Sequence, residues 1–400
     1  MSSLYQNVEM APRDPILGLN EQFNADPRPQ KVNLGIGVYS DDSGRLPLLK
    51  AVRTAEQRHF EGALPRGYLP IEGLAAYNLG AQKLLLGQDS ELIAEGRVVT
   101  VESIGGTGAL KIGADFLKSI VPDATVYISD PSWQNHQAIF ENAGFKVATY
   151  PYYSAATHSL DFEAMKAHFE SLAPGSILIL HACCHNPTGV DPSLAQWQEI
   201  LDVIKARQLI PFLDIAYQGF GAGLDEDAEV VRLFAESGIE MLVSSSFSKS
   251  FSLYGERVGA LTLTTESKEI AAKVLSQIKT VVRTNYSNPP THGATIVATV
   301  LNTPELFSLW EEELGEMRNR IRSMREQLVQ KIKEAGVMRD FSFILEQNGM
   351  FSYSGLSKDQ VDRLREEFGI YAVGSGRICV AALNSKNIDY VAKAIASVLL

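Results

Sequence analysis

Seven short apolar runs constrain the fold of this chain more than any other feature of its sequence. They lie at residues 97–101, 124–129, 146–150, 176–181, 209–214, 240–245 and 258–263. Each is apolar or β-branched nearly throughout, as strands with two buried faces are. Helical patterns separate most of them, for example at residues 109–120, 194–207 and 227–237. The sequence therefore predicts an α/β fold, with a mostly parallel seven-stranded sheet and helices on both of its faces.

A second unit is expected after about residue 302, where the character of the sequence changes. Residues 305–335 form a long charged amphipathic pattern, which suits a helix joining two domains. Residues 341–400 mix short strands with helices predicted at 359–368 and 388–399, as in a small α+β domain. Residues 31–39 are expected to join this unit. The first residues are polar and proline-containing, and they predict an extended arm.

Composition excludes several classes of partner. The chain has 36 Lys and Arg against 47 Asp and Glu, which gives a net charge of −11. Nucleic-acid-binding proteins usually present a basic face, so no nucleic-acid partner is expected. No apolar run reaches the roughly 20 residues of a membrane helix, so no membrane partner is expected either. Three cysteines cannot form a disulfide framework and the first residues do not resemble a signal peptide, which predicts a cytoplasmic protein.

Polar or glycine-rich segments follow five of the predicted strands. In a doubly wound sheet, ligands bind beyond the carboxyl ends of the strands. Any one segment has an ordinary structural explanation, but their shared position indicates a binding site. The five segments are residues 105–108, 130–136, 183–189, 214–217 and 246–250.

Two of these positions suit a phosphate. Residues 105–108 are glycine-rich and precede a predicted helix, whose free N-terminal amides favour an anion. A tight strand-to-helix turn is the alternative. Arg257 supplies a fixed cation that could hold the same phosphate, or it could form a surface ion pair.

Lys249, Asp214 and Tyr217 are candidates for chemistry. A buried lysine loses its charge readily and can attack a carbonyl as a Schiff-base amine, whereas a solvated loop lysine would do nothing. Asp214 ends an apolar strand and needs a partner, such as a protonated heterocyclic nitrogen. A helix N-cap is its alternative role. Tyr217 could donate to a phenolic oxygen or fill the core.

Three further features have two interpretations each. Arg377, flanked by glycine, suits a carboxylate fork or a surface ion pair. Trp133 could stack on an aromatic ligand or fill the core. Residues 181–185 contain two histidines around Cys183 and Cys184, but neighbouring side chains on an extended chain point opposite ways. No second ligand pair has zinc spacing, so no metal is expected and the thiols are predicted to pack in the core.

Taken together, these residues resemble the class I pyridoxal-phosphate (PLP) aminotransferases over nearly the whole chain. The resemblance rests on Asn186-Pro-Thr-Gly189, Asp214-x-x-Tyr217, Ser246-x-Ser-Lys249, Arg257 and Gly376-Arg377. Four further motifs resemble the aspartate/aromatic subgroup: Val32-Asn-Leu-Gly-Ile-Gly-Val-Tyr39, Tyr68-Leu-Pro-Ile-Glu-Gly73, Asn285-Tyr-Ser-Asn-Pro-Pro290 and Asn348-Gly-Met-Phe351. Residues 209–223 and 246–259 look most like the bacterial aromatic-amino-acid (tyrosine) enzymes.

The resemblance implies a fold and an assembly. The fold would be the PLP-dependent transferase fold type I. It would have an N-terminal arm at 1–12, a large PLP-binding domain at 46–314 and a small domain from 13–45 and 315–400. The arm would lie on the partner of a homodimer with shared active sites. The family pattern also implies cis peptides at Asp130-Pro131 and Asn186-Pro187, which proline permits.

It also implies how PLP would be held. Lys249 would carry the cofactor covalently and later move a proton at the substrate. Asp214 would keep the ring nitrogen protonated, Tyr217 and Asn186 would bond the phenolic oxygen, and Trp133 would stack on the ring. The phosphate would be held by Gly105, Gly106, Thr107, Ser246, Ser248, Arg257 and, from the neighbouring subunit, Tyr68. Gly105 can contribute only backbone.

The implied substrates are small amino acids and 2-oxo acids. Arg377, with Asn186, would bind the α-carboxylate, and Gly37 and Trp133 would contact the substrate. Arg283 would cross the dimer interface to a side-chain carboxylate. The implied reaction is a ping-pong transfer from tyrosine or phenylalanine, and from aspartate, to 2-oxoglutarate. An aspartate aminotransferase with dicarboxylate preference is the alternative, because an aromatic side chain requires Arg283 to move or the pocket to repack.

Two rival functions use the same fold. A β-lyase or decarboxylase is disfavoured, since Arg283 together with Arg377 suits dicarboxylate transamination. A non-catalytic regulator is disfavoured because Lys249 is intact and no DNA-binding segment is added.

Overall fold

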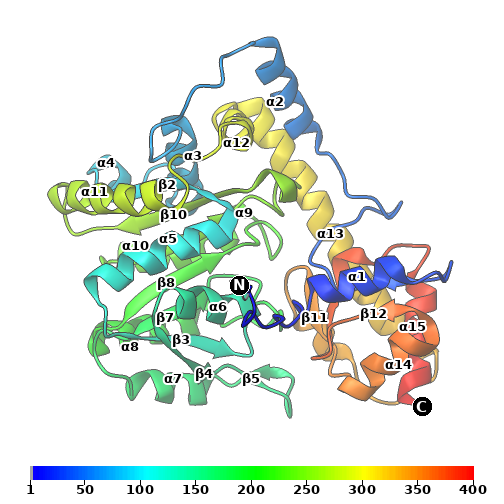
Figure 1. Ribbon diagram of the computed structural model, residues 1–400. Coiled ribbons are helices and arrows are strands. Elements are labelled where there is room, and N and C mark those ends of the chain that lie inside the picture. The colour runs from blue at the N-terminus through cyan, green and yellow to red at the C-terminus, as the bar shows by residue number, and fades with distance from the viewer. Residues whose placement is uncertain (1–2) are drawn as a thin grey trace.

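The computed structural model of the chain describes residues 3–400 and is built around one seven-stranded sheet (Figure 1). The strand order is β2-β10-β9-β8-β7-β3-β4, and only β10 runs antiparallel to its neighbours. The seven strands are those predicted from the apolar runs. Their bounds are Val98–Ile104 (β2), Thr125–Asp130 (β3), Lys146–Pro151 (β4), Ile177–His181 (β7), Ile210–Ile215 (β8), Leu242–Ser246 (β9) and Val258–Thr264 (β10).

Both faces of the sheet are buried, which explains why the strands are apolar throughout. Ile177 and Ile179 of β7 join one core with α5 and α11, whereas Leu178 and Leu180 join the other core with α8. Successive side chains of a strand point to opposite faces of the sheet, so each strand contributes side chains to both cores. The helices of this unit are α2 (Lys50–Glu61), α3 (Ala75–Leu86), α4 (Glu91–Ala94), α5 (Gly105–Ile120), α6 (Gln134–Asn142), α7 (Phe162–Glu170), α8 (Leu194–Arg207), α9 (Leu224–Asp227), α10 (Glu229–Glu236), α11 (Lys268–Asn285) and α12 (His292–Asn302).

Two predicted helices differ from those observed. The stretch expected as one helix over 227–237 is the end of α9 followed by α10, which are separated at Ala228. The glycine-rich residues 105–108 were expected to precede a helix at 109–120, but they form the first turn of α5. Gly105 has φ +66°, a conformation that glycine adopts without steric cost, so the helix starts directly at the end of β2.

Helix α13 (Pro304–Glu334) joins the sheet unit to the C-terminal unit. At 1.5 Å per residue its 31 residues span about 46 Å. It packs against α2 and α12 towards one end and against α15 (Ile388–Leu399) towards the other, as Figure 1 shows. The expected joining helix is therefore confirmed.

The C-terminal unit includes N-terminal residues. It contains α14 (Lys358–Phe368), β11 (Phe351–Tyr353), β12 (Ile370–Tyr371) and β13 (Arg377–Cys379), and β11 pairs with β13. Strand β1 (Val32–Asn33) pairs in parallel with β12, which confirms that residues 31–39 join this unit. Helix α1 (Leu17–Ala25) lies beside the same unit in Figure 1. The domain bounds given above stay a prediction.

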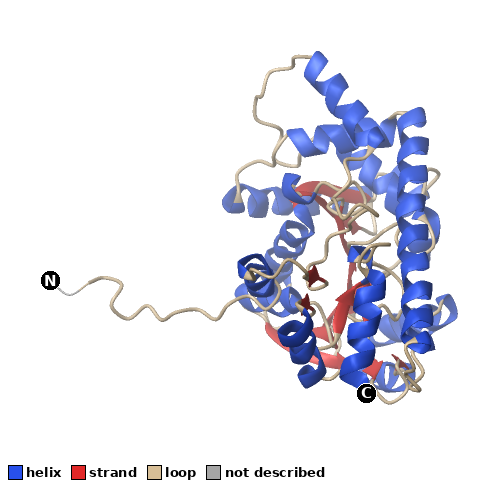
Figure 2. Ribbon diagram, turned by 90° about the vertical axis from the view of Figure 1, so that its right-hand side faces the viewer, coloured by secondary structure: helices blue, strands red, loops and turns tan. Residues whose placement is uncertain are grey.

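The segment before α1 extends away from the rest of the chain (Figure 2). Among its residues, Leu4, Tyr5, Val8 and Met10 are exposed. No helix within residues 3–400 has the length and apolar character needed to cross a membrane. A short hairpin of β5 (Tyr153–Ser154) and β6 (Ser159–Leu160) completes the strands.

Candidate active site

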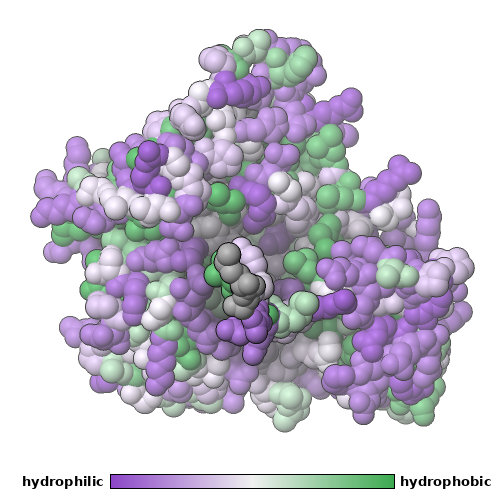
Figure 3. Space-filling model, in the orientation of Figure 1, coloured by the Kyte–Doolittle hydropathy of each residue, from purple (hydrophilic) through white to green (hydrophobic). Residues whose placement is uncertain are grey.

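A pocket of about 760 Å³ lies beyond the carboxyl ends of β7, β8 and β9, where ligands are expected in an open α/β sheet. We call it the central pocket. The sheet unit forms one wall, and Gly37, Phe351 and Arg377 form part of the other. Residues 12–17 line its rim. In Figure 3 this face is hollowed between the sheet unit and the C-terminal unit.

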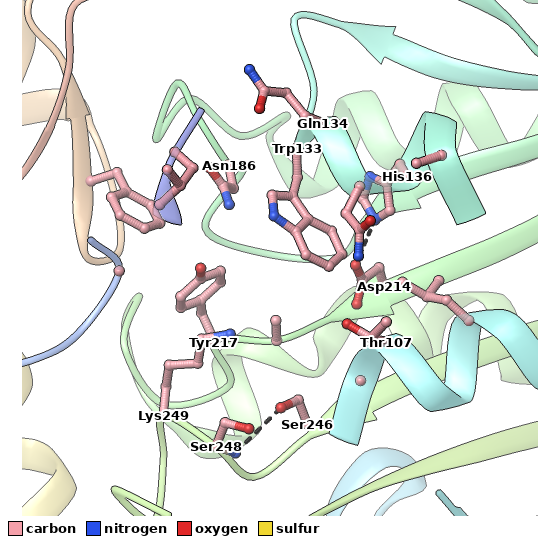
Figure 4. Close-up of a pocket in the computed structure, with 18 of the residues that line it drawn as sticks. Thr107, Trp133, Gln134, His136, Asn186, Asp214, Tyr217, Ser246, Ser248 and Lys249 are labelled. Carbon is pink, nitrogen blue, oxygen red and sulfur yellow. Dashed lines mark hydrogen bonds and ion pairs between the residues drawn. The ribbon is translucent and has the colours of Figure 1, made fainter. Parts of the chain in front are cut away.

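Lys249 enters the central pocket directly after β9. Its Nζ lies 4.9 Å from the centre of the Tyr217 ring (Figure 4). Desolvation lowers the pKa of Lys249 to about 8, and the nearby charge of Asp214 opposes that shift. A neutral amine is therefore accessible near physiological pH, which a nucleophilic lysine requires. The alternative of a fully solvated loop lysine is wrong.

Asp214 lies on β8 and is only 9% exposed. Its Oδ2 accepts a hydrogen bond of 2.7 Å from Nε2 of His136. Its Oδ1 makes no hydrogen bond within residues 3–400, and the carboxylate lines the pocket. Asp214 is thus no helix N-cap, and one oxygen remains free to accept from a ligand N–H.

His136, from α6, is a site residue to which no motif in the sequence assigned a role. Its Nδ1 lies 3.0 Å from Oγ of Ser132, and that hydroxyl lies 3.3 Å from Nε2 of His181. Burial holds the pKa of His181 well below its usual value, so this ring is neutral. The hydrogen bonds from His181 through Ser132 and His136 fix the orientation of Asp214. The sequence could have indicated His136, since it is the last residue of the polar segment 130–136, which lies at the same sheet edge as Asp214.

An anion cradle lies at the N-terminus of α5. Gly106, Thr107, Ser246, Ser248 and Arg257 line the pocket there. Arg257 has φ +54°, and its Nη1 donates to the carbonyl of Tyr254 at 3.0 Å. No ion pair within residues 3–400 involves Arg257, so the surface ion pair proposed as its alternative role is wrong. The guanidinium and the helix amides together can hold a phosphate.

Gly105 lies beneath this cradle and does not line the pocket. A Cβ at this position would collide with the guanidinium of Arg257. The absence of a side chain at Gly105 therefore leaves room for the guanidinium of Arg257.

Arg377 forms a second anion position opposite the cradle. It is only 5% exposed, and its Nη1 donates to Oδ1 of Asn186 at 3.1 Å. Nη2 donates to the carbonyl of Gly35 at 2.5 Å, and Cζ lies 4.1 Å above the centre of the Phe351 ring. Nε has no partner although it is buried. No carboxylate of residues 3–400 pairs with Arg377, so the surface ion pair is excluded here as well.

The remaining predicted ring contacts also face the central pocket. Figure 4 shows Trp133 between Asn186 and Asp214, with Tyr217 on the side of Lys249. Tyr217 is buried, which raises its pKa, so its hydroxyl keeps its proton and can donate. Both predicted cis peptides, at Asp130-Pro131 and Asn186-Pro187, are present.

Gly37 gives room on the C-terminal side of the pocket. A Cβ there would lie 2.8 Å from Cζ of Phe351. Phe351, which packs on Arg377, belongs to one of the quoted motifs, but the sequence assigned it no role. A buried arginine without a carboxylate requires such a ring or amide contact.

Two predicted site residues lie outside the pocket of their own chain. Tyr68 is 94% exposed. Arg283 lies on the exposed side of α11, where its side chain contacts Ser287. Neither lines the central pocket.

The two adjacent cysteines do not point in opposite directions, contrary to the expectation from an extended chain. Their Sγ atoms and an oxygen of Asp227 all lie within 4.8 Å of one another. Cys184 has φ +50°, and this turn brings the thiols together. The carboxylate of Asp227 already accepts N–H groups from Gly219, Gly221 and Ala222. All three cysteines of the chain are buried and free.

Comparison with known proteins identifies the group to which this arrangement belongs. The family described as aminotransferase class I and II matches residues 29–395. The chain belongs to the class I and II aminotransferases. An aspartate aminotransferase of Pseudomonas aeruginosa is 64% identical over 397 residues, covering 99% of this chain and all of the relative. An aromatic-amino-acid aminotransferase of Escherichia coli is 52% identical over 399 residues, with coverage of 99% and 100%.

The fold of this aminotransferase is also similar to that of a solved structure. The aromatic-amino-acid aminotransferase of Burkholderia pseudomallei, covalently bound to pyridoxal phosphate, superposes with a TM-score of 0.98. Sequence identity is 65%, and each chain is covered completely. The predicted fold type and aminotransferase activity are therefore confirmed.

Proposed function

We propose that this aminotransferase uses PLP and exchanges amino groups between aromatic or dicarboxylic amino acids and 2-oxoglutarate. The observation that carries the proposal is the placement of Lys249. Its amine, with a lowered pKa, shares one pocket with a phosphate-sized cradle, a free Asp214 oxygen and the guanidinium of Arg377, whose Nε has no partner. In that order, these groups can react with an aldehyde, bind a phosphate, accept from a ring N–H and bind a carboxylate.

The donor set fits PLP at each of its polar atoms. Gly106, Thr107, Ser246, Ser248 and Arg257 would hold the phosphate, and Gly105 beneath them would leave room for Arg257. Oδ1 of Asp214 would accept from the ring N–H while His136 fixes Oδ2. Tyr217 and Asn186 would donate to the phenolic oxygen. Trp133 would cover one face of the ring.

When bound, the cofactor would withdraw electrons from the substrate Cα, and the chain's own residues would control the proton. Lys249 would take the proton from Cα and then deliver it to a second carbon atom. Its pKa of about 8 lets the amine act as both base and acid near neutral pH. Asp214 would hold the ring proton in place throughout. Residues 12–17 at the rim would restrict water.

The substrate assignments rest on two arginines. Arg377 would bind the α-carboxylate common to every amino donor, with Asn186 and Gly37 beside it. Arg283 would bind the side-chain carboxylate of a dicarboxylic substrate. Relatives named for aspartate, for tyrosine and for aromatic amino acids, each covering nearly the whole chain, support both classes of donor. Aspartate preference is the alternative.

A homodimer with shared active sites would complete this arrangement. Tyr68 and Arg283 are exposed and lie outside the pocket of their own chain, so they are free to serve a partner's pocket. Exposed Leu4, Tyr5 and Met10 in the extended arm support burial against a second copy. Tyr68 would then reach the phosphate of the partner, and Arg283 its substrate. A cytoplasmic location stays a prediction of the sequence.

Steady-state kinetics with 2-oxoglutarate tests the proposal. We expect measurable kcat/KM for aspartate, tyrosine and phenylalanine, with aromatic donors equal to or above aspartate. An enzyme that turns over aspartate alone would support the dicarboxylate alternative. Release of CO₂ or ammonia without amino transfer would support the decarboxylase or lyase. Absence of a visible absorbance band after PLP is added would contradict cofactor binding altogether.

A further inference from the structure

A second, smaller cavity of about 150 Å³ lies where α13 passes two loops of the chain. We call it the α13 cavity. It shares no lining residue with the central pocket. The charged side chains that line it are Arg318, Arg322, Arg325 and Glu326, all on α13. Its other walls come from residues 220–221, 345 and 347–349.

Arg325 is the innermost of these side chains and is 5% exposed. Its Nη2 donates to the carbonyls of Gly349 and Phe351 at 2.7 and 2.6 Å, and Nε donates to Oγ of Ser352 at 3.2 Å. All three acceptors are neutral. Burial lowers the pKa of Arg325 only to about 10, so the group stays charged at neutral pH. Arg325 makes no ion pair within residues 3–400, although the charge of Asp191 partly offsets the effect of burial. A buried charge without an ion-pair partner is costly.

The two other arginines also make no ion pair within residues 3–400, although the charge of Arg318 acts on the buried Asp227. Arg318 donates to the carbonyl of Gly219 at 2.8 Å. Arg322 is exposed and makes no side-chain hydrogen bond within residues 3–400. The ion pairs of the described chain involve six other arginines, namely Arg28, Arg58, Arg97, Arg232, Arg363 and Arg365. Three cations thus face one small cavity with a single lining carboxylate.

The resulting local charge opposes that of the chain. Three arginines and Glu326 give the lining a net charge of +2, in a protein whose net charge is −11. Guanidinium groups bind oxyanions through paired, charge-assisted N–H donors. Among the described hydrogen bonds none uses Nη1 of Arg325, so one pair of N–H donors remains free. A volume of 150 Å³ accommodates a small anion with a few waters.

We propose that the α13 cavity is a binding site for a small oxyanion, such as phosphate, sulfate or a short carboxylate. Arg322 and Arg325 hold the anion from positions three residues apart on α13, and Arg318 adds a third positive charge. The residues around the cavity belong to segments that also build the central pocket. Gly221 lies four residues after Tyr217, and Gly349 lies two residues before Phe351. An anion in the α13 cavity therefore stabilises the junction of the two units.

The test is isothermal titration calorimetry, in which the heat of binding is measured as sulfate, phosphate, acetate or succinate is added to the PLP-loaded protein at constant ionic strength. PLP keeps these anions out of the cradle at Arg257. Wild type is compared with Arg322→Gln and with Lys333→Gln. Lys333 is a matched control because it is exposed, has no described side-chain hydrogen bond or ion pair, and lies eleven residues further along α13, about 16 Å away.

We expect saturable binding that Arg322→Gln weakens at least fivefold and Lys333→Gln leaves unchanged. Binding of sulfate and phosphate alone assigns the site to tetrahedral anions, and binding of acetate or succinate as well extends it to carboxylates. If the anion binds only at Arg377, wild type and both variants should bind it equally. Equal binding by all three proteins overturns the proposal, and so does the absence of saturable binding.

A crystal grown with selenate gives an independent check, since an anomalous peak is expected beside Arg322 and Arg325. A peak confined to the central pocket contradicts the proposal.

Discussion

Replacement of Arg377 by lysine tests the carboxylate site most sharply, because the structure defines what the change removes. Arginine serves Asn186 through Nη1 and Gly35 through Nη2 while its plane rests on Phe351. A lysine keeps the charge but has one ammonium at the end of a flexible stem. It cannot serve Asn186, Gly35 and a substrate carboxylate together in the same geometry.

The magnitude follows from the hydrogen bonds that an ammonium group cannot replace. Loss of one charge-assisted hydrogen bond to the carboxylate costs about 1.5–3 kcal/mol. At about 1.36 kcal/mol per tenfold change, kcat/KM should fall by roughly 10- to 160-fold. Every amino donor has an α-carboxylate, so the fall should be the same for aspartate, tyrosine and phenylalanine.

The assay is steady-state kcat/KM for these three donors with Arg377→Lys and wild type. Thermal unfolding of both proteins serves as the control, because the carbonyl of Gly35 loses its donor in the variant. A loss below threefold would refute the role of Arg377. A loss confined to one donor would show that the residue contacts the side chain of the substrate instead.

Two further predictions concern a residue outside the pocket and a buried carboxyl. Arg283→Leu should lower kcat/KM for aspartate and glutamate far more than for phenylalanine, and equal losses would argue against a side-chain clamp. Glu102 is 1% exposed, and burial raises its pKa from 4.5 to about 8. The folded state then holds a proton that the unfolded state has lost, so the unfolding free energy should fall by up to about 5 kcal/mol as pH rises from about 4.5 to 8. Glu102→Gln should flatten this fall in urea titrations, and an unchanged pH dependence would count against the buried acid.

The main sheet could be predicted because its strands follow one simple rule. A strand buried on both faces needs continuous apolar residues, and the seven runs show this directly. The same rule placed Lys249, Asp214 and the glycines of α5 at one edge, since each follows a strand. The sequence suggested only that residues 31–39 join the C-terminal unit. It did not indicate the pairing of β1 with β12, because two residues carry little pattern.

Side-chain partnerships were harder to predict than positions. The bond between His136 and Asp214 joins residues 78 positions apart, and no local pattern encodes it. The contact of Cys183 with Cys184 depends on a positive φ at a non-glycine residue, which sequence patterns do not reveal. The α13 cavity depends on how one helix passes two loops.

Lys249→Ala is the most direct test of the central claim that this lysine performs the amino transfer. The wild-type protein loaded with PLP should show a visible absorbance band that shifts when glutamate is added, and it should transaminate 2-oxo acids. The variant should fold, as its circular dichroism and unfolding temperature would show, but its transamination should be abolished. Lys333→Ala, with an exposed lysine on α13, should behave like wild type. Near-wild-type turnover by Lys249→Ala would contradict the account.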